Sequence, residues 1–368
     1  MMRRMIKPAA AMIAAALCLM FAAGAAALEN DGDCVYTLMD ENGQVLTMRA
    51  GRMYPGDEYI ARDDRQYRVV QVDDGTMTAV AEYVGQDEGD TEALAAFRAY
   101  AEETVEENAE DGKKLICMYS THSDECYVPS DGESSKWEDA GIYDVGNRLK
   151  KELEKQGITA VYSEETFLPH DADAYTRSRS TAEELLKKGP DALLDIHRDA
   201  IPAEQYETTV EGDDISMVRL FVGRSNQNAA ANKAFAREIK RVADEKYPGL
   251  IKDIYIGKGN YNQELYPQAL LLEMGTHEIE KEKAMGAAEY MADVLDEVLF
   301  GGSAKAEETK TEKRSSAASG IAWAVGLAIL AAVVFAIVST GGLKAAGEKM
   351  KRGASELTGG LFGKKNKK

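Results

Sequence analysis

Cysteine and positive charge are scarce in this sequence of 368 residues, and each shortage excludes a class of protein. Four cysteines without a Cys-x-x-Cys pair give no support to a zinc finger, and they do not form a disulfide framework. A formal net charge of −19 argues against a nucleic-acid partner, because binding phosphates requires a basic surface. The 45% hydrophobic and 29% charged residues nevertheless suit a folded globular protein.

The N-terminus carries an apolar segment that follows several basic residues. It runs from Ala9 to Leu28 and has small residues at Ala25-Ala26-Ala27. A basic start, an apolar middle and small residues near the end are typical of a secretory signal peptide. We therefore predict a signal peptide over residues 1–28, and an uncleaved N-terminal anchor is the alternative.

A second apolar segment lies near the C-terminus. No charged residue occurs from Ile321 to Thr340, and crossing a bilayer takes ~20 apolar residues. We predict a linker at 301–318, a transmembrane helix at 319–342 and a basic tail at 343–368, which the positive-inside rule places in the cytoplasm. The two apolar segments predict a single-pass cell-membrane protein whose main part lies outside the cytoplasm.

Two N-terminal segments precede the main domain. Residues 29–84 predict a small β unit, a meander of about five short strands, because Asn42-Gly43 and Asp73-Asp74-Gly75 are typical turn sequences. Residues 85–113 are strongly acidic and predict a linker, within which Ala93 to Val105 has the pattern of a short amphipathic helix.

Residues 114–300 alternate short apolar runs with helical stretches. In GIYDVGNRLKKELEKQG, for example, Ile142, Val145, Leu149 and Leu153 fall on one helix face. Strands that alternate with helices are typical of βαβ units. We therefore predict an α/β fold with a mainly parallel sheet and helices on both faces. The predicted strands lie in KLICMYS, ITAVYSE, DALLDIH, SMVRLFVG and QALLLEMG.

Histidine and glutamate side chains follow two of these predicted strands. His122 comes after KLICMYST, Glu125 follows three residues later, and His197 closes DALLDIH. In open α/β sheets, sites form at the carboxyl ends of the strands. Two histidines and one glutamate are a zinc-ligand set that leaves the fourth position for water. We predict these three residues as ligands of Zn²⁺, although a His-x-x-Glu pair alone also occurs in ordinary surface loops.

A carboxylate interrupts the apolar strand QALLLEMG at Glu273. A buried carboxylate is costly without a partner. A zinc hydrolase needs a general base that takes a proton from the attacking water. Glu273 is therefore the candidate catalytic base, and a structural salt bridge with an arginine is the alternative.

The segment DIHRDA places further charges around His197. Asp195 is positioned to fix the tautomer of His197 by a hydrogen bond. Arg198 is a candidate catalytic residue that stabilises a carbonyl oxyanion or holds a substrate carboxylate. The other two histidines, His170 and His277, lie in loop-like sequence, and we interpret them as surface residues.

Four segments, in this order, resemble the stage II sporulation protein P family: LICMYSTHSDECYVPS, HDADAYTRSRS, LLDIHRDA and QALLLEMG. Members of that family are cell-wall amidases of endospore-forming bacteria. The resemblance covers about residues 114–298. The β unit ahead of them also resembles the segment that precedes the family's catalytic domain.

The resemblance implies a zinc-dependent N-acetylmuramoyl-L-alanine amidase domain over residues 114–300, with a phosphorylase/hydrolase-like α/β fold. His122, Glu125 and His197 would ligate Zn²⁺, and Glu273 would be the base. The reaction would hydrolyse the amide between muramic acid and L-alanine in peptidoglycan. The implied partners are peptidoglycan and a lytic transglycosylase like stage II sporulation protein D. Related amidases place their carboxylate ligand near Glu138, so Glu125 and Glu138 remain alternatives.

Two other functions remain open at this point. The same ligand pattern occurs in zinc carboxypeptidases and endopeptidases, which would cut stem peptides instead. An inactive wall-binding scaffold, held by the C-terminal span, is the third interpretation. The joint presence of His122, Glu125, His197 and Glu273 argues against the scaffold, because an inactive protein has no need of the full set.

Overall fold

The computed structural model describes residues 34–87, 89, 91–111 and 113–302. The predicted signal peptide, most of the predicted linker, the predicted membrane helix and the basic tail lie outside the described residues. Within the described part, no helix combines the length and the apolar character that crossing a bilayer requires.

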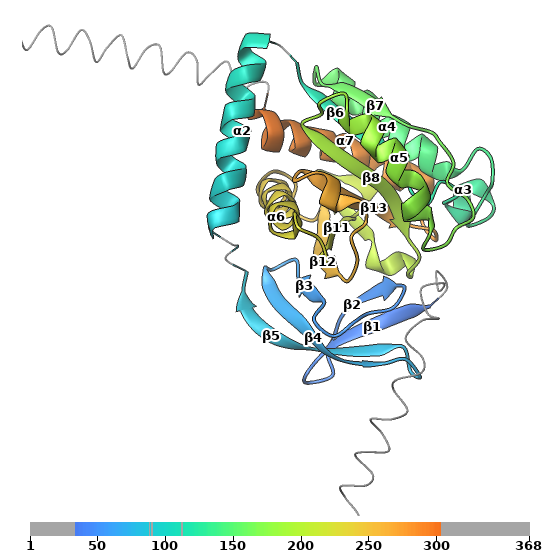
Figure 1. The fold of residues 1–368 in the computed structure, drawn as a ribbon. Coiled ribbons are helices and arrows are strands. Elements are labelled where there is room, and N and C mark those ends of the chain that lie inside the picture. Colours follow the sequence, from blue (N-terminus) through green and yellow to red (C-terminus); the bar gives the residue numbers. More distant parts are fainter. Residues whose placement is uncertain (1–33, 88, 90, 112, 303–368) are drawn as a thin grey trace, which may run out of the picture. The chain divides into compact units, whose positions relative to one another are not determined.

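Eleven strands of the described chain form one sheet, in the order β2-β1-β5-β4-β3-β12-β11-β13-β8-β6-β7. Strands β1 to β5 come from the N-terminal β unit, and the other six belong to the α/β part that follows (Figure 1). A separate hairpin, β9-β10, lies between β8 and β11 in sequence. The strands are β1 (Val35–Asp40), β2 (Val45–Ala50), β3 (Glu58–Ile60), β4 (Arg65–Asp73), β5 (Thr78–Gln86), β6 (Leu115–Tyr119), β7 (Thr159–Tyr162), β8 (Ala192–Asp199), β9 (Glu207–Val210), β10 (Asp213–Ser216), β11 (Val218–Gly223), β12 (Ile251–Gly257) and β13 (Ala269–Thr276).

Helices lie on both faces of the α/β strands, as the sequence predicts, although on the second face they cover only β6 and β8. Helices α4, α6 and α7 pack on one face, α2 lies against α6 and α7, and α5 covers β6 and β8 on the other face (Figure 1). The helices are α2 (Thr91–Asp111), α3 (Val128–Asp131), α4 (Gly141–Lys155), α5 (Ala174–Leu186), α6 (Ala229–Lys246) and α7 (Lys281–Phe300), with short 3₁₀ turns η1 (Ala203–Gln205) and η2 (Gln263–Leu265).

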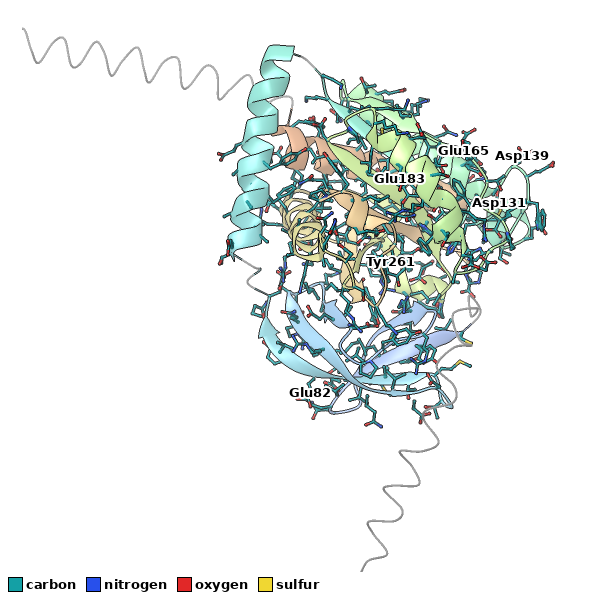
Figure 2. All side chains as sticks on the ribbon, viewed as in Figure 1. Glu82, Asp131, Asp139, Glu165, Glu183 and Tyr261 are labelled. Atoms are coloured by element: carbon teal, nitrogen blue, oxygen red, sulfur yellow. The ribbon has the colours of Figure 1, made fainter. Side chains whose placement is uncertain are left out.

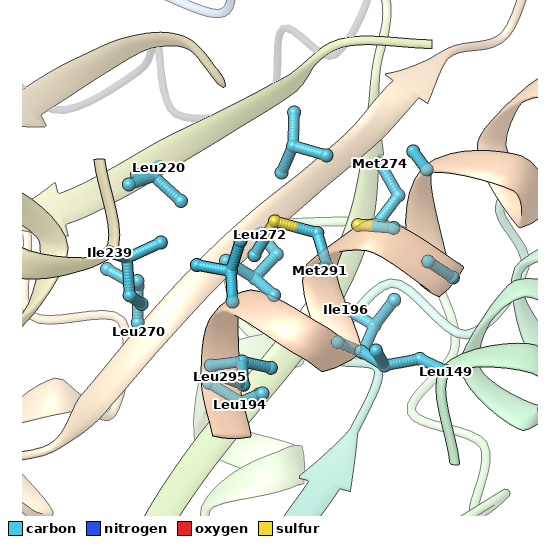
Figure 3. Packing of buried hydrophobic residues seen from close by; sticks show 14 of the residues in the cluster. Leu149, Leu194, Ile196, Leu220, Ile239, Leu270, Leu272, Met274, Met291 and Leu295 are labelled. Carbon is cyan, nitrogen blue, oxygen red and sulfur yellow. The ribbon is translucent and has the colours of Figure 1, made fainter. Parts of the chain in front are cut away.

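The core between the sheet and the helices is built from alternate strand residues. Leu194 and Ile196 of β8 and Leu270 and Leu272 of β13 point into this layer, where they meet Leu295 of α7 and other helix residues (Figure 3). Successive residues of a strand point to opposite faces, so the residues between them face the other side of the sheet. That other side carries the polar residues described below.

The prediction of a mainly parallel sheet holds for the α/β part and is wrong for the sheet as a whole. Among the α/β strands, β12-β11, β13-β8, β8-β6 and β6-β7 pair in parallel, and β11-β13 pairs antiparallel. Antiparallel pairing of β3 with β12 then joins the N-terminal strands to the same sheet. The sheet is therefore mixed, because local periodicity contains no information about which distant strands pair.

The N-terminal strands are not a simple meander either. Strands β3, β4 and β5 follow one another antiparallel, but β1 pairs with β5 in parallel and β2 lies at the edge. Apolar residues of these strands pack against Phe221 of β11, Tyr255 of β12 and Leu271 of β13. The β unit therefore covers the face of the sheet that lies opposite α6 and α7.

The sequence analysis missed β12 and the hairpin β9-β10, and it made α2 too short. Lys252 and Asp253 interrupt the apolar pattern of β12, yet all seven of its residues are buried. A charged pair inside a strand looks like a turn in the sequence, and only its buried partners, described below, reveal it as structure.

Candidate metal centre

Strand β8 is buried along its whole length, although half of its residues are charged or polar. Asp195, His197 and Asp199 alternate with Leu194 and Ile196, which belong to the apolar core. The three polar residues therefore share the opposite face of the sheet. Burying such groups is costly without hydrogen bonds or counter-charges, so this face requires a network of partners.

Neighbouring strands extend this polar face. The register places Glu273 of β13 beside His197 of β8 and also beside Arg219 of β11. Asp253 of β12 lies beside Arg219 on its other side. Because residues paired in register point to the same face, a row of four ionisable side chains crosses the sheet.

The loop after β6 brings two more side chains to one end of this row. Oε1 of Glu125 lies 3.4 Å from Nδ1 of His122 and 3.5 Å from Nδ1 of His197. A tetrahedral zinc ion with bonds of about 2.0–2.1 Å to nitrogen and oxygen has ligand–ligand edges of about 3.3–3.4 Å. Within the described part of the chain, His122, Glu125 and His197 form a group whose ligand atoms lie within 4.8 Å of one another. The donors and their spacing fit zinc.

Outer contacts hold Glu125 and His197 in place. The backbone N–H of Arg198 donates to Oε2 of Glu125 at 2.8 Å, which leaves Oε1 facing the two histidines. Nε2 of His197 lies 2.9 Å from Asp195 Oδ1, an ion-pair distance, but its geometry does not make the hydrogen bond that the sequence analysis expected behind this ring. Asp195 in turn accepts hydrogen bonds from the N–H and the hydroxyl of Thr121, at 2.8 and 2.7 Å.

The ionisation of the three residues suits a cation. Burial lowers the pKa of His122 to about 4, so its imidazole is neutral and its nitrogen lone pair is available. Burial opposes the charge on Glu125, but His197 and Arg198 outweigh it and hold the pKa of this carboxyl well below its usual range. Burial also opposes a charge on His197, yet Asp195 and Glu125 raise its pKa well above the usual value. The carboxylates of Asp195 and Glu125 thus favour positive charge at the position of His197.

Glu273 and His197 are the two residues of the row with an unsatisfied buried atom, and the carboxyl of Glu273 is the acidic one. Its Oε2 is buried and has no hydrogen-bond partner among the described residues. Burial, followed by the neighbouring Asp199 carboxylate, raises the pKa of Glu273 to about 8. Arg219 pairs in register with Glu273, but its guanidinium bonds go to Asp199, Asp253 and the β2 strand. The expected alternative, a salt bridge from Glu273 to an arginine, is absent from the ion pairs of the described chain.

Arg198 lies beside the centre with its guanidinium engaged by main-chain atoms. Nε donates to the carbonyl of Cys126 at 3.1 Å and Nη2 to the carbonyl of Ser134 at 2.8 Å. Nη1 lies 4.0 Å from Glu125 Oε1. The side chain therefore braces the loop that carries Glu125, and its catalytic role stays a prediction.

Glu138, the alternative carboxylate ligand, is exposed and does not line the pocket that contains the histidines. Figure 2 labels the next residue, Asp139, in the loop beyond α3. Two residues before His122, the hydroxyl of Ser120 is buried and hydrogen-bonded to Tyr162 at 2.7 Å. The geometry therefore favours Glu125 as the carboxylate.

A pocket of about 890 Å³ opens over the centre. Residues from β2, from the loop after it and from the α/β part line it together with His122, Glu125, His197 and Glu273. Tyr261, which also lines the pocket, lies between β1–β5 and the α/β strands in Figure 2. The pocket is large enough for part of a polymeric substrate, since small-molecule sites commonly measure about 300–1,000 Å³.

The sequence analysis missed several residues of this pocket. His170 and His277, interpreted as surface residues, both line it, and the ring of His170 stacks on His122 at 3.9 Å between centroids. The ring of Tyr175 lies 5.4 Å from that of His122 and 6.3 Å from that of His197. The segment HDADAYTRSRS contains two of these residues and was the signal that could have identified them.

Comparison with solved structures finds distant likenesses. An N-acetylmuramoyl-L-alanine amidase from Clostridium difficile 630 is 14% identical, with a TM-score of 0.35, over 51% of this chain and 96% of that one. The CwlD amidase from Clostridioides difficile, solved in complex with the GerS lipoprotein, is 15% identical, with a TM-score of 0.35, over 51% of this chain and 98% of that one.

Comparison of sequences is more specific. Stage II sporulation protein P of Bacillus subtilis (strain 168) is 30% identical over 207 residues, which cover 51% of this chain and 52% of that protein. The match thus spans about half the length of this curated relative. The profile of the family described as "Stage II sporulation protein P (SpoIIP)" matches residues 48–296, more than half of the chain. The chain belongs to the stage II sporulation protein P family.

Proposed function

We propose that the protein is a zinc-dependent N-acetylmuramoyl-L-alanine amidase of the cell wall, acting during sporulation. The observation that carries this proposal is the group of His122, Glu125 and His197, in which Glu125 Oε1 stands near the edge length of a zinc tetrahedron from a nitrogen of each histidine. Membership of the stage II sporulation protein P family supports cell-wall hydrolysis as the process. The pocket over this group offers room for a muramyl peptide.

Each side chain has a distinct part in hydrolysis. His122, Glu125 and His197 would hold the ion, and Asp195, 2.9 Å from Nε2 of His197, would orient that ring. Zinc, when bound, supplies a Lewis acid that activates water and polarises the scissile carbonyl. Glu273 accepts the proton of the attacking water and delivers it to the leaving amine of L-alanine.

The environment of Glu273 supports this assignment. A general base works best when its pKa is near the working pH, and burial together with Asp199 raises the pKa of Glu273 to about 8. Its position beside His197 in the strand register brings its carboxyl to the centre. The ring of Tyr175 lies beside the rings of both histidines.

We also propose that the catalytic part works outside the cytoplasm, anchored by the C-terminal apolar segment. The support is in the sequence alone: the N-terminal apolar segment and the uncharged run from Ile321 to Thr340 followed by lysines. The proposed partners are peptidoglycan and a lytic transglycosylase like stage II sporulation protein D. Protease added to intact cells should digest the part before the run and spare the tail.

The test of the function is a product analysis with purified protein, zinc and isolated peptidoglycan. We expect mass spectrometry to find intact stem peptides with a free L-alanine amine, and glycan without peptide. His197→Ala should abolish both products, and Glu184→Gln, an exposed carboxylate on α5 paired with Lys187, should not. Cuts only between peptide residues would instead indicate the zinc endopeptidase, and no product would favour the inactive scaffold.

A further inference from the structure

Arg49 of β2 brings a guanidinium into the pocket from the N-terminal β unit. Its Cζ lies 5.1 Å from the ring centroid of Phe221 and 5.2 Å from that of Tyr255. Its Nη1 donates to the carbonyl of Arg52. None of the described carboxylates lies within ion-pair distance of Arg49, so this charge is held against aromatic faces without a counter-ion.

The other arginines that line the pocket are already engaged. Arg52 pairs with Asp74 at 2.7 Å, Arg179 pairs with Glu264, and Arg219 pairs with Asp253 at 2.7 Å. The guanidinium of Arg198 is bonded to main-chain carbonyls. These side chains therefore have little capacity left for a ligand.

Lys258 is the second pocket cation without a carboxylate partner among the described residues. Its Nζ lies 4.4 Å from the ring centroid of Tyr54, which comes from the same N-terminal unit as Arg49. Two cations on aromatic supports thus line a pocket whose arginines other than Arg49 are already engaged. Aromatic support orients a cation and leaves its hydrogen-bond donors available.

The main chain next to Arg49 is tied to the metal-bearing strand. The N–H of Ala50 donates to Oδ1 of Asp199 at 3.4 Å, two residues after His197 on β8. Asp199 itself is held by the hydroxyl of Tyr206 and by Arg219, each at 2.9 Å. Arg49 is therefore placed relative to the centre by a hydrogen bond as well as by the sheet.

A partly buried guanidinium without a counter-ion costs free energy that a bound anion recovers. The substrate of the proposed amidase has carboxylates as the anionic groups of its peptide. Guanidinium binds a carboxylate through two parallel hydrogen bonds, which gives direction as well as charge. The free cation and the substrate thus complement each other.

We propose that Arg49, assisted by Lys258, binds the free carboxylate of the stem peptide nearest to the scissile amide, and so selects the substrate. This inference rests on the proposed amidase function and deepens it. It gives the N-terminal β unit a role in the pocket: Arg49 binds substrate, and the amide is hydrolysed at the metal centre.

The test compares two muramyl tripeptides that differ at the second residue of the stem, one with a free α-carboxylate and one with a carboxamide. We expect the unmodified protein to prefer the carboxylate by about tenfold to a hundredfold in kcat/KM, because hydrogen bonds between charged groups contribute this much. Arg49→Gln should remove the preference, mainly through a higher KM, and Arg49→Lys should keep part of it. Arg68→Gln, half exposed on β4 and outside the pocket lining, should behave like the unmodified protein.

A preference that survives Arg49→Gln would overturn the inference, and so would an equal loss on both substrates. If the protein cleaves neither substrate, the proposed function fails, and binding decides the inference separately. Calorimetry with Glu273→Gln protein should then show tighter binding of the carboxylate form, lost when Arg49→Gln is added. Equal binding of both forms would overturn it. Thermal unfolding of each variant shows whether a loss reflects misfolding.

Discussion

Two clusters of buried charge lie on the same face of one sheet, and they differ in how completely their atoms are paired. In the first, Arg219 is 1% exposed and uses all three nitrogens. It donates to Asp253 and Asp199, and to Thr47 and the Met48 carbonyl of β2. Lys252 also donates hydrogen bonds to Asp253 and Thr47. We call all of these residues together the Arg219 cluster.

The second cluster is the metal centre, and it is incompletely paired. Oε2 of Glu273 has no partner among the described residues, and Oε1 of Glu125 stands 3.4 and 3.5 Å from two imidazole nitrogens. The Arg219 cluster joins β11, β12 and β2, so it stabilises the contact between the two parts of the sheet. A cluster whose buried polar atoms all have partners is a structural network, whereas a cluster with buried polar atoms that lack a partner is a candidate site for a ligand.

The largest expected effect is a loss of activity when the metal centre is altered. Glu273→Gln keeps the shape of the side chain and removes the base, so we expect kcat to fall about 10²- to 10⁴-fold. Zinc content should not change. Stability should not fall, because burial and Asp199 raise the pKa of Glu273 to about 8, which makes its charge unfavourable at neutral pH. The measurements are product formation, metal content and urea unfolding.

Glu82→Gln, an exposed substitution on β5 labelled in Figure 2, is the control for this experiment and should leave all three unchanged. Full activity of Glu273→Gln would contradict the role of the base. A loss of zinc in that variant would instead make Glu273 a ligand.

Substitutions in the Arg219 cluster should lower the free energy of unfolding. Arg219→Met leaves Asp253 and Asp199 buried without their main counter-charge, so we expect the free energy of unfolding to fall by about 3–5 kcal/mol. Arg241→Met removes a half-exposed pair with Glu238 on α6 and should cost about 0–1 kcal/mol. Urea unfolding at neutral pH measures both. Similar losses for the two variants would remove the contrast between the clusters.

The Arg219 cluster should also make the free energy of unfolding depend on pH. Burial opposes the charge of Asp253, but Arg219 and Lys252 outweigh it and hold its pKa well below the usual range. A carboxyl with a lowered folded pKa contributes stability above its unfolded pKa of about 3.9, and this contribution is lost as the pH falls below that value.

We therefore expect unfolding free energy to decrease on acidification below about pH 4, with Asp253 contributing up to about 1.4 kcal/mol per pH unit. In Arg219→Met, the pKa of Asp253 lies nearer its usual value, so the decrease should be shallower. Urea unfolding between pH 2.5 and 6 gives the two slopes. Equal slopes would mean that Asp253 is not the group responsible.

The smallest expected effect is that of Glu138→Gln, and comparison with Glu125→Gln separates the two candidate carboxylate ligands. Glu138→Gln should leave zinc affinity unchanged, because Glu138 is exposed and outside the pocket lining. Glu125→Gln should weaken zinc binding by more than the about 10- to 100-fold that outer partners of a site contribute. Competition with a chromogenic chelator measures both affinities. A strong effect of Glu138→Gln would move the metal centre to the loop beyond α3.

Local pattern was enough to select the residues of the centre. His122, Glu125 and His197 follow predicted strands, and parallel strands bring their carboxyl ends to one edge, so the sequence could place them together. Glu273 was recognisable as a carboxylate in an apolar strand. Their chemical roles stay predictions.

The pairing of distant segments was beyond the sequence. Strand β3 joins β12 across about two hundred residues of chain, and this contact brings Arg49 into the pocket. Strand β12 itself was missed because Lys252 and Asp253 are charged. The counter-charge of Asp253 is Arg219, more than thirty residues earlier in the chain, and periodicity in one segment cannot reveal it.

The most direct test of the central claim is X-ray diffraction from crystals of the zinc-loaded protein, recorded on both sides of the zinc absorption edge. We predict one anomalous peak between His122, Glu125 and His197, with bonds of about 2.0–2.2 Å to two nitrogens and one carboxylate oxygen. The peak should be absent in His197→Ala crystals. No peak at this position in the unmodified protein, or zinc bound through Glu138 instead, would contradict the account.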